Sequence, residues 1–135
     1  MKIAITGSNG FVGSETKKLL LEQGHEVLGF GIMAGQDIRD KNQFNNFIKE
    51  HKPDRILHLA AIARFNDADN DPKLAVETNV FGTKNIVEVA QKYHIPLVFS
   101  STGSVYMPIT DYTGTIKENW PAKGNSVYGC SKYQA

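Results

Sequence analysis

Short apolar runs alternate along the chain with longer stretches whose apolar residues recur at helical spacing. Four runs are bounded by glycine or polar residues, which is typical of buried parallel strands. They are KIAIT at 2–6, HEVLGFG at 25–31, RILHLAAIA at 55–63 and IPLVFSS at 95–101. The stretches between them have the period of amphipathic helices. They lie at 11–23, 40–51 and 72–93.

Local signals mark the ends of the predicted helices. Gly24 ends the first helix, and Asp40 can cap the second. Pro53, in HKPD, stops the second helix because proline cannot continue it. Pro72 suits the first turn of the third helix. A last helix is predicted to begin near Ser126, after a turn-rich segment.

Each of the three crossover helices has apolar positions on one side, and these predict the face that packs on the sheet. The predicted positions are Val12, Thr16, Leu19 and Leu20, then Phe44, Phe47 and Ile48, then Val76, Val80, Thr83, Ile86, Val87 and Ala90.

The regular alternation of strands and helices indicates right-handed crossovers and a parallel sheet with helices on both faces. We therefore predict an α/β fold, a doubly wound parallel sheet of the Rossmann-like kind. The length suits one domain over residues 1–135.

Composition and charge narrow the class of protein. The net charge is +1 without a basic stripe, so no nucleic-acid partner is expected. The apolar runs are far short of a membrane span and the N-terminus lacks a signal-peptide core, so we expect a cytoplasmic protein without membrane contact. The histidines are too dispersed to predict a metal site, and His58 is predicted to be a packed core residue.

The sequence TGSNGFVG places Gly7, Gly10 and Gly13 directly after the first strand and at the start of the first helix. There, the absence of β-carbons lets a pyrophosphate approach the helix N-terminus, where free N–H groups and the dipole favour anions. Gly13 would also let the helix pack closely on the strand. The spacing is G-x-x-G-x-x-G rather than the standard G-x-G-x-x-G, and a tight turn that binds nothing is the alternative.

The end of the second strand bears on the choice between NAD and NADP. Sites of this kind commonly place an acid there to hold the adenosine ribose, but this chain has Gly31, and the nearest acid is Asp37. No arginine lies beside Gly31 to accept a 2′-phosphate, and Arg39 is the closest candidate. We therefore predict NAD as the cofactor, with NADP as the alternative.

Near the C-terminus, Tyr128 and Lys132 lie at positions i and i+4 and so share one face of the last helix. A phenol is a poor base at neutral pH, but a neighbouring ammonium favours the phenolate. Tyr128 could then take a proton from a substrate hydroxyl while hydride leaves the same carbon. A chance surface pair is the alternative, but ligands of doubly wound sheets bind at the strand ends, where this pair is expected.

Thr102 directly follows the fourth strand and can donate a hydrogen bond to the reacting oxygen. Ser101 and Ser104 are competing hydroxyl groups, and an ordinary turn residue is the alternative for Thr102. The predicted catalytic residues are Thr102, Tyr128 and Lys132.

Six segments in order extend over essentially the whole chain. They are TGSNGFVG, DIRD, HLAAIA, ETNVFGTKNIVEVA, VFSSTGSVY and YGCSKYQA. Together they resemble the extended short-chain dehydrogenase/reductase family, the NAD(P)-dependent nucleotide-sugar epimerases, dehydratases and reductases. The resemblance implies an enzyme that binds NAD(P) and acts on a nucleotide-activated sugar.

The resemblance also implies the residues that bind the cofactor. Asp37 and Ile38 would flank the adenine, and the backbone N–H groups of Phe11 and Val12 would face the pyrophosphate. Asn79 would lie near the active site. The complete predicted set is Gly7, Gly10, Phe11, Val12, Gly13, Asp37, Ile38, Leu59, Ala60, Ala61, Asn79, Tyr128 and Lys132.

Some positions depart from the family pattern. Gly31 replaces the usual acid, and Met107 follows SVY where glycine is common. The compact segment between Gly31 and Asp37 is similar to that of the dehydrorhamnose-reductase branch. No Asp-Glu pair follows VFSST, which favours epimerisation or reduction over dehydration.

Family members continue for about as long again, with further strands and a substrate domain. We therefore expect this chain to be a fragment of a longer protein, with a truncated gene product as the alternative. The resemblance allows a homodimer in the complete protein. A non-catalytic dinucleotide-binding module is the alternative function.

Overall fold

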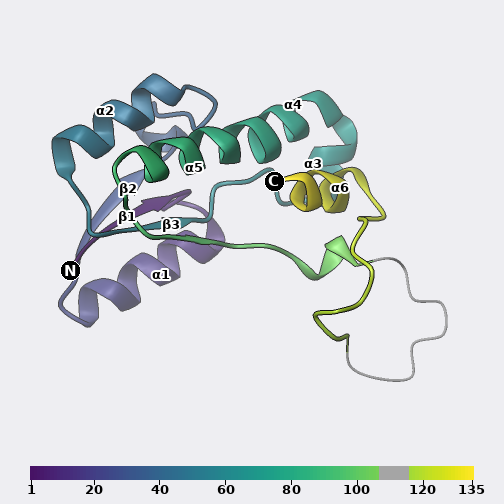
Figure 1. Cartoon of the computed structure of the whole chain (residues 1–135), viewed down its shortest axis with the longest axis horizontal. Coiled ribbons are helices and arrows are strands. Elements are labelled where there is room, and N and C mark those ends of the chain that lie inside the picture. The colour runs from purple at the N-terminus through teal and green to yellow at the C-terminus, as the bar shows by residue number, and fades with distance from the viewer. Residues whose placement is uncertain (107–115) are drawn as a thin grey trace.

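The computed structural model describes residues 1–106 and 116–135, so Met107 lies outside the described residues. Its strands are β1 (Lys2–Thr6), β2 (Glu26–Phe30), β3 (Arg55–His58) and β4 (Leu97–Phe99). All pairings are parallel, in the order β2-β1-β3-β4. Helix α1 (Phe11–Glu22) lies on one face of this sheet, and α2 (Lys41–His51) and α5 (Thr83–Lys92) lie on the other (Figure 1). The predicted Rossmann-like α/β fold is confirmed.

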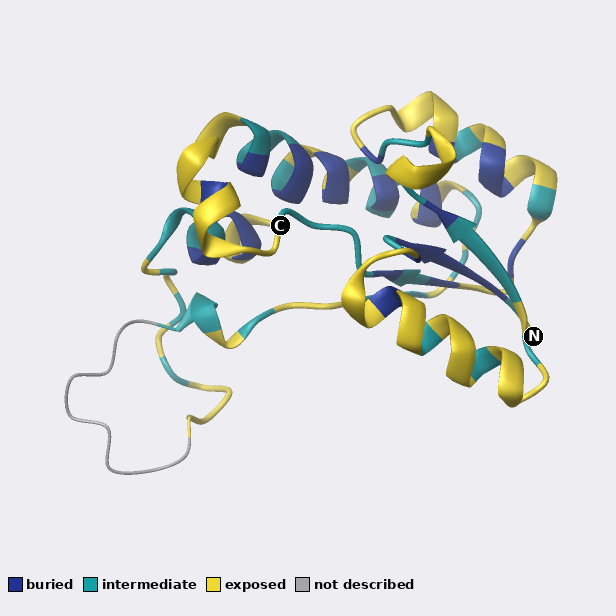
Figure 2. Cartoon of the chain, turned by 180° about the vertical axis from the view of Figure 1, so that it is seen from behind, coloured by how far each residue is buried: buried dark blue, intermediate teal, exposed yellow. Residues whose placement is uncertain are grey.

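The principal core lies between the sheet and helices α2 and α5, where the buried residues of both helices gather (Figure 2). Phe30 of β2 meets Phe44 and Phe47 edge-on, with ring centroids 5.1 and 5.2 Å apart, a favourable aromatic geometry. The predicted buried face of α2, which also includes Ile48, is confirmed. Asp40 caps this helix as predicted, because its side chain accepts two backbone N–H groups of the first turn.

The opposite face of the sheet is sparsely covered, and two positions of the predicted α1 stripe are wrong. Val12 and Leu19 are 58% and 54% exposed, and Gly13 is the buried residue of the helix. Side chains alternate along β4, so Leu97 packs against the core while Val98 points to the α1 side and is 61% exposed. Helical spacing identified an apolar stripe, but burial also needs a neighbouring element that covers it.

The third crossover contains more than the single helix predicted over 72–93. It comprises α3 (Phe65–Asn70), α4 (Pro72–Val76), a π-helical segment η2 (Glu77–Gly82) and α5. The wider turn changes which side chains face inward, in η2 and just before it. Thr78 and Asn79 are buried, whereas Val76 and Val80, which were predicted to face the sheet, are half-buried. Such π-helical turns often occur at functional sites.

Strands β3 and β4 end at His58 and Phe99, earlier than the predicted ends at 63 and 101. The segments that follow them leave the sheet at its C-terminal edge. Two short 3-10 turns, η1 (Ile32–Ala34) and η3 (Gly103–Val105), follow β2 and β4. Helix α6 (Val127–Gln134) begins where predicted, because the Ser126 hydroxyl accepts the Gly129 N–H at 3.0 Å and caps it.

Candidate functional site

Gly7 turns the chain from β1 toward α1 in a conformation that favours glycine. Its φ is +71°, and a β-carbon there would lie 2.8 Å from backbone atoms of Ala60. Gly10 donates its N–H to the Gly7 carbonyl at 3.0 Å and closes the turn. A β-carbon at Gly13 would collide with the same carbonyl, so Gly13 permits the close packing of α1 that its position predicted.

The first turn of α1 presents backbone N–H groups without a side-chain cap. Gly10 is the N-cap residue and makes no side-chain cap bond, and Ser14 donates the first N–H back to it, at 2.9 Å. The N–H groups of Phe11 and Val12 therefore have no partner inside the helix. The Phe11 side chain is 92% exposed. The N-terminus of α1, which carries the positive end of the helix dipole, therefore lies at the glycine turn.

A cavity of about 340 Å³ opens beside the glycine turn, at the C-terminal ends of β1, β2 and β3. Several predicted cofactor residues line it together: Gly7, Gly10, Asp37, Ile38, Leu59, Ala60 and Ala61. Sequence reasoning did not select Asn9, Met33, Gln36, Leu74 and Thr78, which also line it. Asn9, Met33 and Gln36 lie in turns, where no periodic pattern shows which side chains face a cavity, and Leu74 and Thr78 lie in short helical segments that replace the single helix predicted there.

The side-chain amide of Gln36 lies beside Gly31, directly after β2, where sites of this kind commonly have an acid. Gly31 donates its N–H to Gln36 Oε1 at 3.3 Å, and both residues line the cavity. A β-carbon at Gly31 would be in ordinary contact with Gly7, 3.9 Å away, so the glycine turn itself does not exclude a side chain there. Neither a carboxylate nor a cation is therefore placed at Gly31 itself.

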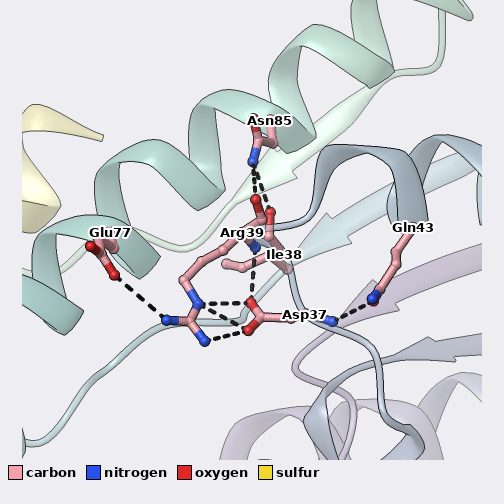
Figure 3. A network of polar contacts seen from close by, with 6 residues as sticks. All are labelled: Asp37, Ile38, Arg39, Gln43, Glu77 and Asn85. Carbon is pink, nitrogen blue, oxygen red and sulfur yellow. Dashed lines mark hydrogen bonds and ion pairs between the residues drawn. The ribbon is translucent and has the colours of Figure 1, made fainter.

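Asp37 is held by a bidentate ion pair with Arg39, shown in Figure 3. Arg39 Nη2 donates to Asp37 Oδ2 at 2.6 Å and Nε donates to Oδ1 at 3.1 Å, and Nη1 of Arg39 lies 3.6 Å from Glu77 of η2. Hydrogen bonds from Arg39 hold the pKa of Asp37 below its usual value. Arg39 thus has two carboxylate partners, which weakens its candidacy as a dedicated partner for a 2′-phosphate.

Backbone contacts also fix the segment around Ile38 (Figure 3). Asn85 of α5 donates its side-chain amide to the carbonyls of Ile38 and Arg39, at 3.1 and 3.0 Å. Gln43 of α2 accepts the Asp37 N–H at 3.0 Å. The segment that lines one side of the cavity is therefore bound from α2, η2 and α5.

A chain of hydrogen bonds crosses the interior below the cavity. Thr83 Oγ1 donates to the Asn79 carbonyl at 2.6 Å, so it must accept from His58 Nε2, 2.9 Å away. His58 Nδ1 is then the acceptor for the Thr6 hydroxyl at 2.6 Å, and Thr6 accepts the Ala60 N–H at 3.3 Å. His58 is fully buried as predicted, and burial, with a smaller contribution from the charge of Lys132, lowers its pKa to about 4.

Asn79 ties the loop after β3 to helix α6. Its side chain accepts the Ile62 N–H at 2.8 Å, and its amide donates to the Ile62 carbonyl at 3.1 Å and to Ser131 Oγ at 2.9 Å. Ser131 in turn donates to the Tyr128 carbonyl at 2.8 Å. Asn79 is fully buried and does not line the cavity, so the structure gives it protein partners beneath the site.

Tyr128 lies against Phe65 of α3, with ring centroids 5.5 Å apart and nearly perpendicular planes. A β-carbon at the adjacent Gly129 would collide with the Ser104 carbonyl of η3, so glycine allows α6 to approach that turn. Thr102 Oγ1 accepts the Ser104 N–H at 3.2 Å, which leaves the hydroxyl proton of Thr102 available for donation. Tyr128 therefore lies on a helix, α6, that packs against η3, and Thr102 directly precedes η3.

Lys132 shares α6 with Tyr128 but is only 5% exposed, so the two do not form a solvent-facing surface pair. Its Nζ lies 3.9 Å from the centroid of the Phe99 ring. Burial lowers the pKa of Lys132 to about 8. Phe99 ends β4, so the ammonium lies at the same edge of the sheet as the glycine turn.

Two further observations concern the described part of the chain. No group of three or more His, Cys, Asp or Glu side chains is placed to hold a metal ion within residues 1–106 and 116–135. Over the same ranges, no helix has the length and apolar character needed to cross a membrane.

Parallel strands, an uncapped helix behind a glycine turn, and a cavity at the strand ends define a dinucleotide-binding α/β domain. The model of the NAD dependent epimerase/dehydratase family matches residues 3–135, and the chain belongs to that family. This confirms the resemblance to the extended short-chain dehydrogenases/reductases. The members of this family bind NAD(P), which confirms the predicted class of cofactor.

Individual relatives agree with this assignment. CDP-paratose 2-epimerase of Salmonella typhi is 29% identical over 98% of this chain and 50% of its own length. The UDP-glucose 4-epimerase of Thermus thermophilus, solved with NAD, superposes with a TM-score of 0.90 and 32% identity. That match covers 98% of this chain and 48% of the epimerase.

A reductase superposes equally well. The dTDP-4-dehydrorhamnose reductase of Bacillus anthracis strain Ames, solved with NADP, has a TM-score of 0.89 and 27% identity, over 98% of this chain and 46% of that one. The chain thus spans about half the length of the relatives it matches.

Proposed function

We propose that this chain is the cofactor-binding part of an NAD(P)-dependent epimerase or reductase that acts on a nucleotide-activated sugar. The named relatives are epimerases of CDP- and UDP-sugars and a dTDP-sugar reductase. NAD is the proposed cofactor and NADP the alternative. Gly31 and Gln36 supply no cation for a 2′-phosphate, and Arg39, the nearest cation, is already paired with Asp37 and Glu77.

The residues present fit a dinucleotide. The glycine turn lets a pyrophosphate approach the N–H groups of Phe11 and Val12, and Gly13 keeps α1 close to the strand. In our proposal Asp37 accepts the adenine amino group while Ile38 packs against the base. The apolar wall formed by Leu59, Ala60 and Ala61 suits the rest of the adenosine.

We propose that the nicotinamide end of the dinucleotide lies beside Thr102, Tyr128 and Lys132. In our proposal Tyr128 takes the proton of the substrate hydroxyl, Thr102 donates a hydrogen bond to the same oxygen, and Lys132 binds the nicotinamide ribose hydroxyls. When bound, the nicotinamide supplies hydride acceptance and return. Asn79 acts through α6, because it holds Ser131 and thereby the turn that carries Tyr128.

One observation carries the proposal: the ammonium of Lys132 is buried beside Phe99, one helical turn from Tyr128. A buried lysine ammonium is costly, and lysine is rarely fully buried unless it is paired or functional. A helix that only packed against the sheet would have an apolar residue there. Tyr128 itself is half-buried and so remains accessible to a substrate.

Replacement of Tyr128 by phenylalanine tests the chemistry. In the complete protein, Tyr128→Phe should lower turnover of the accepted nucleotide sugar by at least about 100-fold, because the proton acceptor is lost. The dissociation constant of NAD should change little. Tyr133→Phe is the matched control, since Tyr133 is an exposed tyrosine of the same helix and should keep full turnover.

Two outcomes would contradict the proposal. Unchanged turnover in Tyr128→Phe would remove the tyrosine from the mechanism. Binding of NAD or NADPH by the unmodified complete protein, without turnover across a panel of CDP-, UDP- and dTDP-sugars, would instead support a non-catalytic dinucleotide-binding module.

A further inference from the structure

The Lys132 ammonium lies on the face of an aromatic ring. Nζ lies 3.9 Å from the centroid of the Phe99 ring, in cation–π contact. The two residues come from β4 and α6 and are brought together only by the fold. The Phe99 ring therefore contributes to holding α6 against the sheet edge as well as to the environment of the lysine.

This contact matters because the part of the chain that the structure describes offers the ammonium little else. Lys132 is 5% exposed, so water covers very little of its side chain. Among the described residues, no carboxylate or hydrogen-bond acceptor offsets the effect of burial on its pKa. The negative face of an aromatic ring is then a significant favourable electrostatic contact for the charge.

The Phe99 ring is itself held in place by the neighbouring ring of His58. Its centroid lies 5.6 Å from that of the His58 ring, with the planes tilted by 32°. His58 is fixed on both nitrogens by Thr6 and Thr83, so it cannot turn away from Phe99 without breaking a buried hydrogen bond. The position of the ammonium is thus linked to rigid groups of β1, β3 and α5.

We propose that Phe99 is the positioning residue of Lys132: its ring face holds the ammonium at the sheet edge before the cofactor arrives. This inference rests on the proposed function for the role of Lys132 toward the nicotinamide ribose. The contact itself is a property of the protein alone. Preorganisation of this kind lowers the cost of ordering a long side chain when a ligand binds.

The contact has a spectroscopic signature that a merely structural residue would not produce. Protons over an aromatic ring face are shifted upfield, so the ε-methylene protons of Lys132 should be upfield of those of the other lysines. The measurement uses protein labelled with ¹³C-lysine, and the loss of that signal in Lys132→Arg assigns it. In Phe99→Leu the upfield shift should disappear, and in Phe99→Trp it should persist.

The functional consequence is measured by titration with NADH. Phe99→Leu should weaken NADH binding by about three- to tenfold, and Phe99→Trp should bind within about twofold of the unchanged protein. Val98→Leu is the matched control, because the neighbouring side chain points to the opposite face of the sheet and is 61% exposed. It should alter neither the Lys132 signal nor the affinity.

The result that overturns the inference does not depend on a variant that folds. If the unchanged protein shows no upfield-shifted lysine signal at all, the ammonium does not lie on the ring. A folded Phe99→Leu protein with the upfield shift and NADH affinity intact would overturn it as well. An upfield signal without NADH binding would instead contradict the proposed function and leave the contact in place.

Discussion

Thr83 on α5 and His58 on β3 are joined by a 2.9 Å hydrogen bond in the fully buried interior. Thr83 uses its own proton on the Asn79 carbonyl, so the imidazole must be the donor. The neutral tautomer of His58 with its proton on Nε2 is therefore set by a threonine hydroxyl. This bond connects β3, whose C-terminal end borders the cavity, with the helical crossover that includes Asn79.

Loss of that hydroxyl should destabilise the fold. Thr83→Val keeps the shape of the side chain but leaves His58 Nε2–H without its acceptor, so the free energy of unfolding should fall by about 1–3 kcal/mol. Thr83→Ser keeps the hydroxyl and should lose less. Urea denaturation of both variants checks this, and equal losses in the two would show that the hydrogen bond contributes little.

Stability should fall in acid because His58 is buried in its neutral form. Its pKa is lowered to about 4 in the folded protein, against about 6.5 in the unfolded chain. The unfolded state therefore binds more protons between these values, and the free energy of unfolding should decrease as the pH falls from about 6.5 to 4, by up to about 3 kcal/mol.

The acid effect is assigned with two histidine variants. His58→Gln should abolish the part of the pH dependence between about 6.5 and 4, whatever its effect on absolute stability. His94→Gln is the control, since His94 is exposed, and it should keep the whole dependence. A parallel pH profile in His58→Gln and the unchanged protein would contradict the prediction.

The buried charge of Lys132 should lower the free energy of unfolding near neutral pH. Burial lowers its pKa to about 8, below the value of about 10.4 in the unfolded chain. The cost of burying the ammonium is therefore fully present below about pH 8 and is lost as the pH rises to about 10.4. Lys132→Met should raise the free energy of unfolding at pH 7, by up to about 3 kcal/mol, and less at pH 10.

Denaturation at pH 7 and pH 10 measures this difference. Lys49→Met is a suitable control, since Lys49 is an exposed lysine of α2 and should show no comparable pH-dependent gain. A gain for Lys132→Met that is the same at both pH values would show that packing, rather than charge, is responsible. A gain in stability when a functional residue is removed is expected, because active sites commonly sacrifice stability for activity.

Gly129 should be required for the approach of α6 to η3. Gly129→Ala places a β-carbon against the Ser104 carbonyl, so α6 must shift and the protein should lose about 1–3 kcal/mol of stability. The shift would also displace Tyr128, so turnover should fall in the complete protein.

Gly103→Ala is the matched control, because a β-carbon at that position of η3 meets nothing within 4 Å. It should change stability by no more than about 0.5 kcal/mol and leave turnover intact. Similar losses in both variants would show that the turn tolerates a methyl group equally at either place.

Local features of the sequence were enough to predict most of the fold. The apolar runs and the Asp40 cap act through neighbours in the chain, and the structure places elements where those signals indicated. The helical period failed where a longer-range feature intervened. It assigned Val12 and Leu19 to a buried face, although burial depends on what covers α1, and it missed the change of face near η2.

The candidate site divides in the same way. Gly7, Gly10 and Gly13 were recognisable because a strand–glycine–helix turn has a local mechanism, and their strained or crowded positions agree with it. Neither Phe99 nor Ser131 could be selected, because each acts through a partner distant in sequence. The preferred tautomer of His58 likewise follows from Thr83 and Asn79, which no spacing rule connects to it.

The sequence alone determined that this chain forms strands and helices in βαβ order with a glycine turn at the first helix, since hydrophobic period and turn chemistry operate over a few residues. Only the tertiary structure decided that Lys132 is buried on an aromatic ring, that Arg39 is shared by two carboxylates and that His58 is held neutral. The physical reason is that electrostatic environment and solvent exclusion are set by groups that folding brings together from distant parts of the chain.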